Sequence, residues 1–303
     1  FLLFPLVMKQ KQNPPVMAMP QQNGPQLSFK EVLDQSASSA MRGGTAGALA
    51  MGANVAALMW MRTTINYQYR TGSTITTALK TLYADGGIPR FYRGVVPALV
   101  QGPLSRFGDT AANTGMLTMM NGMAETRDLP VMVKTISASV AAGLFRIFLM
   151  PIDTCKTTMQ VTGSIKPVFA KVKASGPTVL YHGSLAAASA TFVGHYPWFL
   201  TYNFLSEKLP KQDTQMGELG RRALMGFCSS AVSDTCSNSI RVVKVYKQSA
   251  TNVISYPAAI REVLAKGGIT DLMFRGLETK ILANGMQGIL FSILWKKFEE
   301  LLF

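Results

Sequence analysis

The sequence is poor in the residues from which catalytic sites, metal centres and disulfide frameworks are built. Its 303 residues include only three cysteines and two histidines. Cys155, Cys228 and Cys236 are too few and too irregularly spaced for a disulfide framework, which fits a reducing compartment. Because the sequence has no nucleophile–base pairing and no metal-ligand cluster, we expect no enzymatic activity, no metal and no catalytic cofactor.

Charged residues are also scarce, at 15% of the chain against 48% hydrophobic residues. Together with 26 glycines and 18 methionines, this suits helices packed tightly in lipid better than a solvated surface. The charge is one-sided, with 30 Lys and Arg against 16 Asp and Glu, and would attract nucleic acid or anionic lipid. The basic residues are spread along the chain without zinc-ligand spacing or a basic heptad helix, so we expect a lipid partner and no nucleic acid.

No clean apolar run long enough to cross a bilayer is present. The opening stretch from Phe1 to Val7 is apolar but too short, and residues 8–26 are rich in Pro, Gln and Asn. We expect residues 1–37 to form an N-terminal tail.

Six longer segments are mostly apolar and rich in Gly, Ala and Ser, which is typical of closely packed helices. They lie near residues 38–68, 96–122, 130–160, 184–208, 217–248 and 277–300. Lys134 and Arg146 interrupt one of them, and charged residues at membrane depth normally face a bundle interior or a watery cavity. A soluble helical bundle is the alternative to a membrane protein.

One short phrase occurs three times at a nearly constant interval. The copies are FYRG, LYHG and MFRG, and they end at Gly94, Gly183 and Gly276. Each copy follows a polar segment that ends in a glycine turn, at residues 85–87, 175–176 and 266–268. A long helix on either side of each copy predicts three repeats of two helices each.

These repeats divide the chain into a tail and three units, at residues 1–37, 38–127, 128–215 and 216–303. Short segments between the long helices, such as residues 74–83 and 258–265, are predicted to be surface helices that join them.

The second repeat contains PIDTCKTTMQ from Pro151 to Gln160, with proline, an acid, a base and glutamine at fixed spacing. This segment and the three glycine phrases resemble the mitochondrial carrier family over almost the whole chain after residue 38. The resemblance implies an all-α membrane protein: six tilted transmembrane helices in three pseudo-threefold repeats around a central cavity, with three short matrix-side helices. It also implies a multi-pass protein of the mitochondrial inner membrane.

Pro151 removes a backbone donor and is expected to kink its helix toward the bundle axis. Asp153 and Lys156 lie three residues apart, so they share a helical face and can each reach a neighbouring helix. An ion pair there would hold the matrix side shut. An ordinary helix break with a solvated charge pair is the alternative.

The other two copies of this motif have lost the acid, and the matrix gate that the resemblance implies consists of Arg62, Asp153, Lys156, Arg241 and Lys244. If neighbouring repeats pair, Asp153 meets Lys244, Lys156 lacks a partner and Arg241 lies near Arg62. Two like charges that are partly desolvated would disfavour closure.

The resemblance also implies substrate contacts about two helical turns beyond each glycine. The candidates there are Gln101, Ala190, Thr191, Ala283 and Asn284, with Arg106 and His195 nearby. A packed, hydrogen-bonded interface residue is the alternative for His195. The gate at the opposite, cytoplasmic side keeps only remnants, which are Tyr202, Asn203, Trp295, Lys296 and Glu299.

Each repeated glycine would open a helix whose free backbone amides can bind a lipid phosphate. The residues concerned are Arg93, Gly94, His182, Gly183, Arg275 and Gly276. The resemblance implies three cardiolipin sites, and a plain glycine turn is compatible with them.

Two functions remain open. The first is transport of a small neutral or amphoteric metabolite by alternating access with degenerate gates, since the candidate contacts are mostly uncharged. The second is a non-transporting accessory subunit of a large inner-membrane assembly, such as a respiratory complex, with the N-terminal tail contacting other subunits. The damaged gates favour the second function, and the fold and repeats favour the first.

Overall fold

The protein is described from a computed structural model that covers residue 30, residues 44–122, 126 and 129, and residues 131–302. The expected N-terminal tail lies outside the described residues, except for residue 30.

The described residues form helices, with no strand among them, which confirms the all-α prediction. The long helices are α2 (Gly44–Thr71), α4 (Val95–Gly122), α6 (Val131–Phe148) with α7 (Met150–Thr162), α9 (Ser184–Lys208), α10 (Gln215–Ser249) and α12 (Leu277–Leu302). The short ones are α3 (Ile75–Phe91), α8 (Lys166–Ser175), a 3-10 turn (Pro177–Tyr181) and α11 (Tyr256–Phe274). α9 begins and ends at the predicted residues, whereas α3 and α11 extend beyond residues 74–83 and 258–265.

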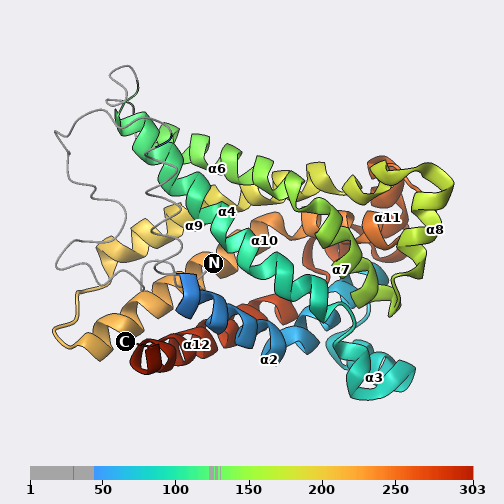
Figure 1. Ribbon diagram of the computed structural model, residues 1–303, viewed down its shortest axis with the longest axis horizontal. Helices are drawn as coiled ribbons and strands as arrows, with labels where there is room; N and C mark the ends of the chain where they lie inside the picture. The colour runs from blue at the N-terminus through green and yellow to red at the C-terminus, as the bar shows by residue number, and fades with distance from the viewer. Residues whose placement is uncertain (1–29, 31–43, 123–125, 127–128, 130, 303) are drawn as a thin grey trace.

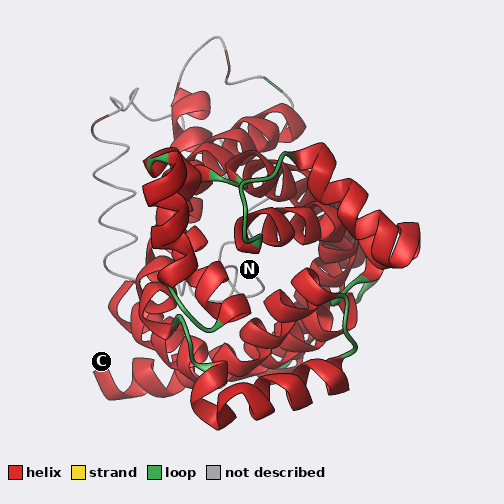
Figure 2. Ribbon diagram, turned by 90° about the vertical axis from the view of Figure 1, so that its right-hand side faces the viewer, coloured by secondary structure: helices red, strands yellow, loops and turns green. Residues whose placement is uncertain are grey.

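The long helices form a closed ring. Each packs against the next in chain order, from α2 through α4, α6, α9 and α10 to α12, and α12 packs back on α2. Figure 2 shows this ring end-on, and Figure 1 shows α3, α8 and α11 gathered at one end of the bundle. Side chains at the centre of the ring are therefore contributed by helices from the whole described chain.

The segment predicted as one helix over residues 130–160 is divided at Leu149 into α6 and α7. The two parts, Ile136–Phe148 and Met150–Thr162, are bent by 65° relative to each other. Pro151 lies in the first turn of α7. Backbone N–H groups in the first turn have no partner within the helix, so the missing N–H of proline costs no hydrogen bond there. Within the described residues, no single helix is long and apolar enough to cross a membrane, and this bent pair meets the requirement by length and composition only when its two parts are taken together.

A glycine with non-helical backbone angles lies where each short polar segment ends. Gly87, Gly176 and Gly268 have φ values of 62°, 80° and 68°, with ψ values of −152°, 175° and −165°. This combination is accessible almost only to glycine. The turns expected at residues 85–87, 175–176 and 266–268 are therefore present.

Among the described residues, the largest buried apolar cluster lies where α2, α10 and α11 meet. Met61, Tyr246 and Val263 are each at most 1% exposed there. This core joins one of the short helices to the ring beside the cavity described below.

A buried or half-buried cation from each short segment bonds the carboxyl end of a long helix. Arg90 donates to the carbonyl oxygens of Gln160 (3.0 Å) and Val161 (2.8 Å). Lys171 donates to the carbonyl oxygen of Gln248 (2.9 Å), and Arg275 donates to that of Tyr69 (3.2 Å). The last carbonyls of a helix have no partner within it, and its dipole favours positive charge there. These contacts fix the ends of α7, α10 and α2.

We predict that Arg90→Gln lowers the free energy of unfolding by about 2 kcal/mol, because a charged donor to two carbonyl oxygens is lost from a buried site. Thermal unfolding of the full chain in detergent measures the effect as a lower unfolding temperature. Lys80→Gln, at an exposed position of the same helix, is the matched control and should leave that temperature unchanged. Equal losses in both variants would contradict the proposed role of Arg90.

Candidate functional site

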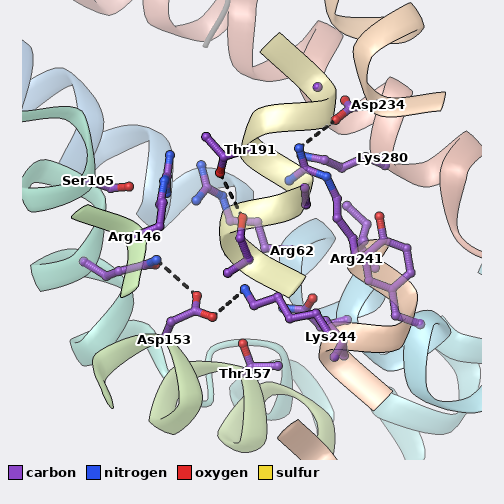
Figure 3. Close-up of a pocket in the computed structure, with 18 of the residues that line it drawn as sticks. Arg62, Ser105, Arg146, Asp153, Thr157, Thr191, Asp234, Arg241, Lys244 and Lys280 are labelled. Atoms are coloured by element: carbon purple, nitrogen blue, oxygen red, sulfur yellow. Dashed lines mark hydrogen bonds and ion pairs between the residues drawn. The ribbon is translucent and has the colours of Figure 1, made fainter. Parts of the chain in front are cut away.

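A cavity of about 330 Å³ lies within the ring and is lined by residues from every long helix. Its described lining contains six basic and two acidic side chains, which are Arg62, Arg146, Lys156, Arg241, Lys244, Lys280, Asp153 and Asp234. Figure 3 shows Asp153 and Lys244 at the floor of the view, with Arg146 on one wall and Lys280 and Asp234 on the opposite wall. The cavity is therefore a strongly charged chamber.

The floor cluster consists of Asp153, Lys156, Lys244 and Gln101. The Asp153 carboxylate lies 2.8 Å from Lys156 and 2.5 Å from Lys244, and it accepts a hydrogen bond of 3.1 Å from Gln101. Lys156 also donates to Gln101 at 2.5 Å. The expected approach of Lys244 to Asp153 is present, but the expectation that Lys156 lacks a partner is wrong, because one carboxylate serves both ammonium groups.

A second group, the wall cluster, consists of Asp234, Arg241, Asn284 and Lys280. Asp234 lies 3.7 Å from Arg241 and accepts a hydrogen bond from Asn284, whose side-chain oxygen lies 3.3 Å from Lys280. Arg241 therefore pairs with an acid of its own helix rather than facing Arg62 alone. Arg62 itself donates to Gln287 on α12 at 2.8 Å.

Sequence reasoning missed Asp234 because it lies outside the motif copied among the repeats. A usable signal was its spacing, since seven residues before Arg241 is about two helical turns and places both side chains on one face of α10. Lys280 was missed as well, and Arg146 was noted only as a charge within a predicted helix.

The candidate substrate contacts that the structure describes all line the cavity, namely Gln101, Ala190, Thr191, His195, Ala283 and Asn284. Gln101 belongs to the floor cluster, and Thr191 bonds the carbonyl of Ala187 in its own helix at 3.0 Å. His195 Nδ1 lies 2.7 Å from the Ser139 hydroxyl. The side chain of Arg106 lies outside the described residues.

The remnants of the opposite gate are only partly described. Tyr202 is buried and stacks on Trp198, with ring centroids 5.0 Å apart, and Asn203 is half-buried. The side chains of Trp295, Lys296 and Glu299 lie outside the described residues. Near this end, Arg221 donates to the carbonyl oxygens of Ser206 (2.7 Å) and Leu209 (3.1 Å), which joins α10 to the end of α9.

The candidate lipid residues differ in what they can offer a phosphate. Gly94, Gly183 and Gly276 directly precede α4, α9 and α12, so the free amides of each helix start there. Arg93 is exposed. Burial, with the nearby charges of Lys247 and Lys171, lowers the pKa of His182, which favours the neutral imidazole over a cation that could pair with a phosphate.

Arg275 does not fit the expected lipid contact. Its side chain is 1% exposed and bonds Asp271 and the carbonyl of Tyr69. Because this guanidinium is committed to the end of α2, it is turned away from any external phosphate.

We predict that Asp153→Asn destabilises the protein by about 3–5 kcal/mol, because two ammonium groups then share a largely buried site with no carboxylate. Lys244→Gln should cost less, since Asp153 keeps Lys156. Thermal unfolding in detergent ranks the variants, with Asp213→Asn at an exposed position as the matched control. A larger loss from Lys244→Gln than from Asp153→Asn would contradict the shared-carboxylate arrangement.

Residues 127–213 match the family model for mitochondrial carrier proteins. This segment nearly coincides with the predicted second repeat at residues 128–215, and the other two repeats stay predictions. A mitochondrial carrier-like protein of Acanthamoeba polyphaga mimivirus is 24% identical over 146 residues, which are 48% of this chain and 57% of that relative. The chain thus spans a little over half the length of the relative it matches. These two matches support a divergent member of the mitochondrial carrier family, with the family model matching residues 127–213.

Proposed function

We propose that this protein carries a small metabolite across the mitochondrial inner membrane through the cavity of Figure 3. Family membership supports transport and the inner membrane as its location. The ring of long helices supports a multi-pass arrangement of six tilted transmembrane segments, in which α6 and α7 together make one bent segment. By family resemblance, α3, α8 and α11 lie on the matrix side.

The observation that carries the proposal is that every long helix contributes to the cavity lining. A solute held there contacts all the elements that must move to expose it on the other side. Such contacts can favour one arrangement of the helices over another, which is the energetic requirement for alternating access.

The floor cluster provides the barrier toward the matrix side. Asp153 on α7 bonds Lys244 on α10 and Gln101 on α4, so passage in that direction separates three helices. The Asp153 carboxylate has to be released from its partners on the other helices, and substrate binding must offset the lost ion pairs. The damaged gate is thus compatible with transport, because the surviving acid serves two bases.

Lipid binding belongs to the same proposal. The backbone amides that follow Gly94 and Gly183 lie at the starts of α4 and α9 and would donate hydrogen bonds to cardiolipin phosphates at the membrane surface. Arg93 would add a charge-assisted contact beside Gly94.

Uptake into cardiolipin-containing proteoliposomes tests transport. We predict saturable uptake of at least one small metabolite and a loss of at least tenfold in Thr191→Trp, because the larger ring fills part of the cavity. Thr270→Trp, at an exposed position on α11, is the matched control and should retain uptake.

Isolation from native membranes in mild detergent separates this proposal from the accessory-subunit alternative. Migration as a small particle together with saturable uptake supports a carrier. Stoichiometric migration with a large complex, combined with no uptake of any solute by the reconstituted protein, would overturn transport and favour the accessory role.

A further inference from the structure

The helices α9 and α10 are joined by hydrogen bonds as well as by packing. They are neighbours in the ring, and among the described helices they share the most extensive contact. Figure 1 shows the link between them at the end of the bundle away from α3, α8 and α11. Because α9 ends the predicted second repeat and α10 begins the third, their contact is a seam between two repeats.

In the middle of the seam the two helices approach closely at Gly194. The Ser233 hydroxyl on α10 donates to the carbonyl oxygen of Gly194 on α9 at 2.7 Å. A Cβ atom at position 194 would lie 2.9 Å from that hydroxyl oxygen, so a larger residue there would displace the Ser233 side chain. About one turn further along α9, the indole N–H of Trp198 donates to the Ser230 hydroxyl on α10 at 3.3 Å. Both bonds cross from one helix to the other.

At the end of the seam, Arg221 of α10 holds the last turn of α9. Its side chain is 7% exposed and donates to the carbonyl oxygens of Ser206 at 2.7 Å and Leu209 at 3.1 Å. It also lies 3.1 Å from the carboxylate of Glu218, which compensates the buried positive charge. The last carbonyl oxygens of a helix have no partner within it, and a cation is favoured beside them. This clamp therefore costs α9 no internal hydrogen bond.

The three contacts share one register. From Gly194 through Trp198 to Ser206, the positions on α9 advance by four and then by eight residues. Their partners on α10 go back by three and then by nine residues. Each series therefore covers a dozen residues, about 18 Å of helix. A slide of α9 along α10 by one turn would break all three contacts together.

We propose that α9 and α10 move as one rigid unit, and that the movement takes place between this pair and α6 with α7. The inference rests on the proposed transport function. Opening of the floor separates Asp153 on α7 from Lys244 on α10. Because α10 carries α9 with it, the contact that α9 makes with α6 changes in the same step. The second and third repeats then stay together at their seam throughout the transport cycle.

Two engineered disulfides test where the movement lies, in a background whose three native cysteines are replaced by alanine. Gly194→Cys with Ser233→Cys locks α9 to α10, and Gly143→Cys with Ala188→Cys locks α6 to α9. Cβ atoms at positions 143 and 188 would lie 3.7 Å apart, a distance that suits a disulfide.

Uptake into proteoliposomes is measured before and after oxidation. The solute is the one that the unmodified chain takes up fastest from a labelled set of amino acids, carboxylates and inorganic phosphate. The α9–α10 disulfide should keep at least half of the saturable uptake. The α6–α9 disulfide should lower it at least tenfold, with recovery on reduction.

A second variant tests the clamp itself. Arg221→Gln should lower uptake severalfold, because α9 can then separate from α10. The α9–α10 disulfide should restore uptake in this variant, which would not happen if the substitution merely caused misfolding. Arg222→Gln is the matched control and should leave uptake unchanged, since Arg222 bonds Glu218 on its own helix at 2.9 Å.

Equal effects of the two disulfides, whether loss or retention of uptake, would overturn the inference, because the seam would then not differ from the neighbouring contact. Failure of the α9–α10 disulfide to restore uptake in Arg221→Gln would also count against it. In both cases transport stays in place, since the reduced protein still takes up solute. If the unmodified chain takes up no solute, the transport proposal fails and the rigid pair fails with it.

Discussion

The carboxylate of Asp153 is the interaction on which the arrangement around the cavity depends. The Asp153 side chain is 6% exposed, and its carboxylate is contacted by Lys156 from its own helix, Lys244 from α10 and Gln101 from α4. A carboxylate in such a place is stable only if opposite charges and hydrogen bonds compensate its lost hydration. Three helices converge on one point because each supplies part of that compensation. Asp153 lies in the first turn of α7, directly after the 65° bend between α6 and α7.

The outer contacts hold two of these helices, α7 and α10, from their ends, and they hold α2 in the same way. Arg90, Lys171 and Arg275 each donate to carbonyl oxygens at the end of α7, α10 and α2. The floor cluster thus acts on α7 and α10 from inside the ring, and the cations act on the same two helices from the short segments. A movement that opens the floor need not break the outer contacts if each helix turns together with its attached segment. This division of roles fits a bundle that moves as rigid units.

Local chemistry made much of the fold predictable. The glycine phrases mark the starts of α4, α9 and α12, and Pro151 marks the break before α7, because Gly and Pro act on the backbone at their own positions. The ends of α3 and α11 were not predictable, since helical residues resume after Gly87 and Gly268. In the site, the motif around Pro151 located Asp153 and its approach to Lys244. It could not show that Lys156 shares that acid, because sharing depends on distances in space.

Asp234 shows why the rest of the site escaped prediction. A comparison of the three repeats identifies residues of the shared motif that are kept or lost at matching positions. Asp234 lies outside that motif, so the comparison does not identify it. Its carboxylate compensates Arg241 within α10, which removes the repulsion between Arg241 and Arg62 that the damaged motif implied.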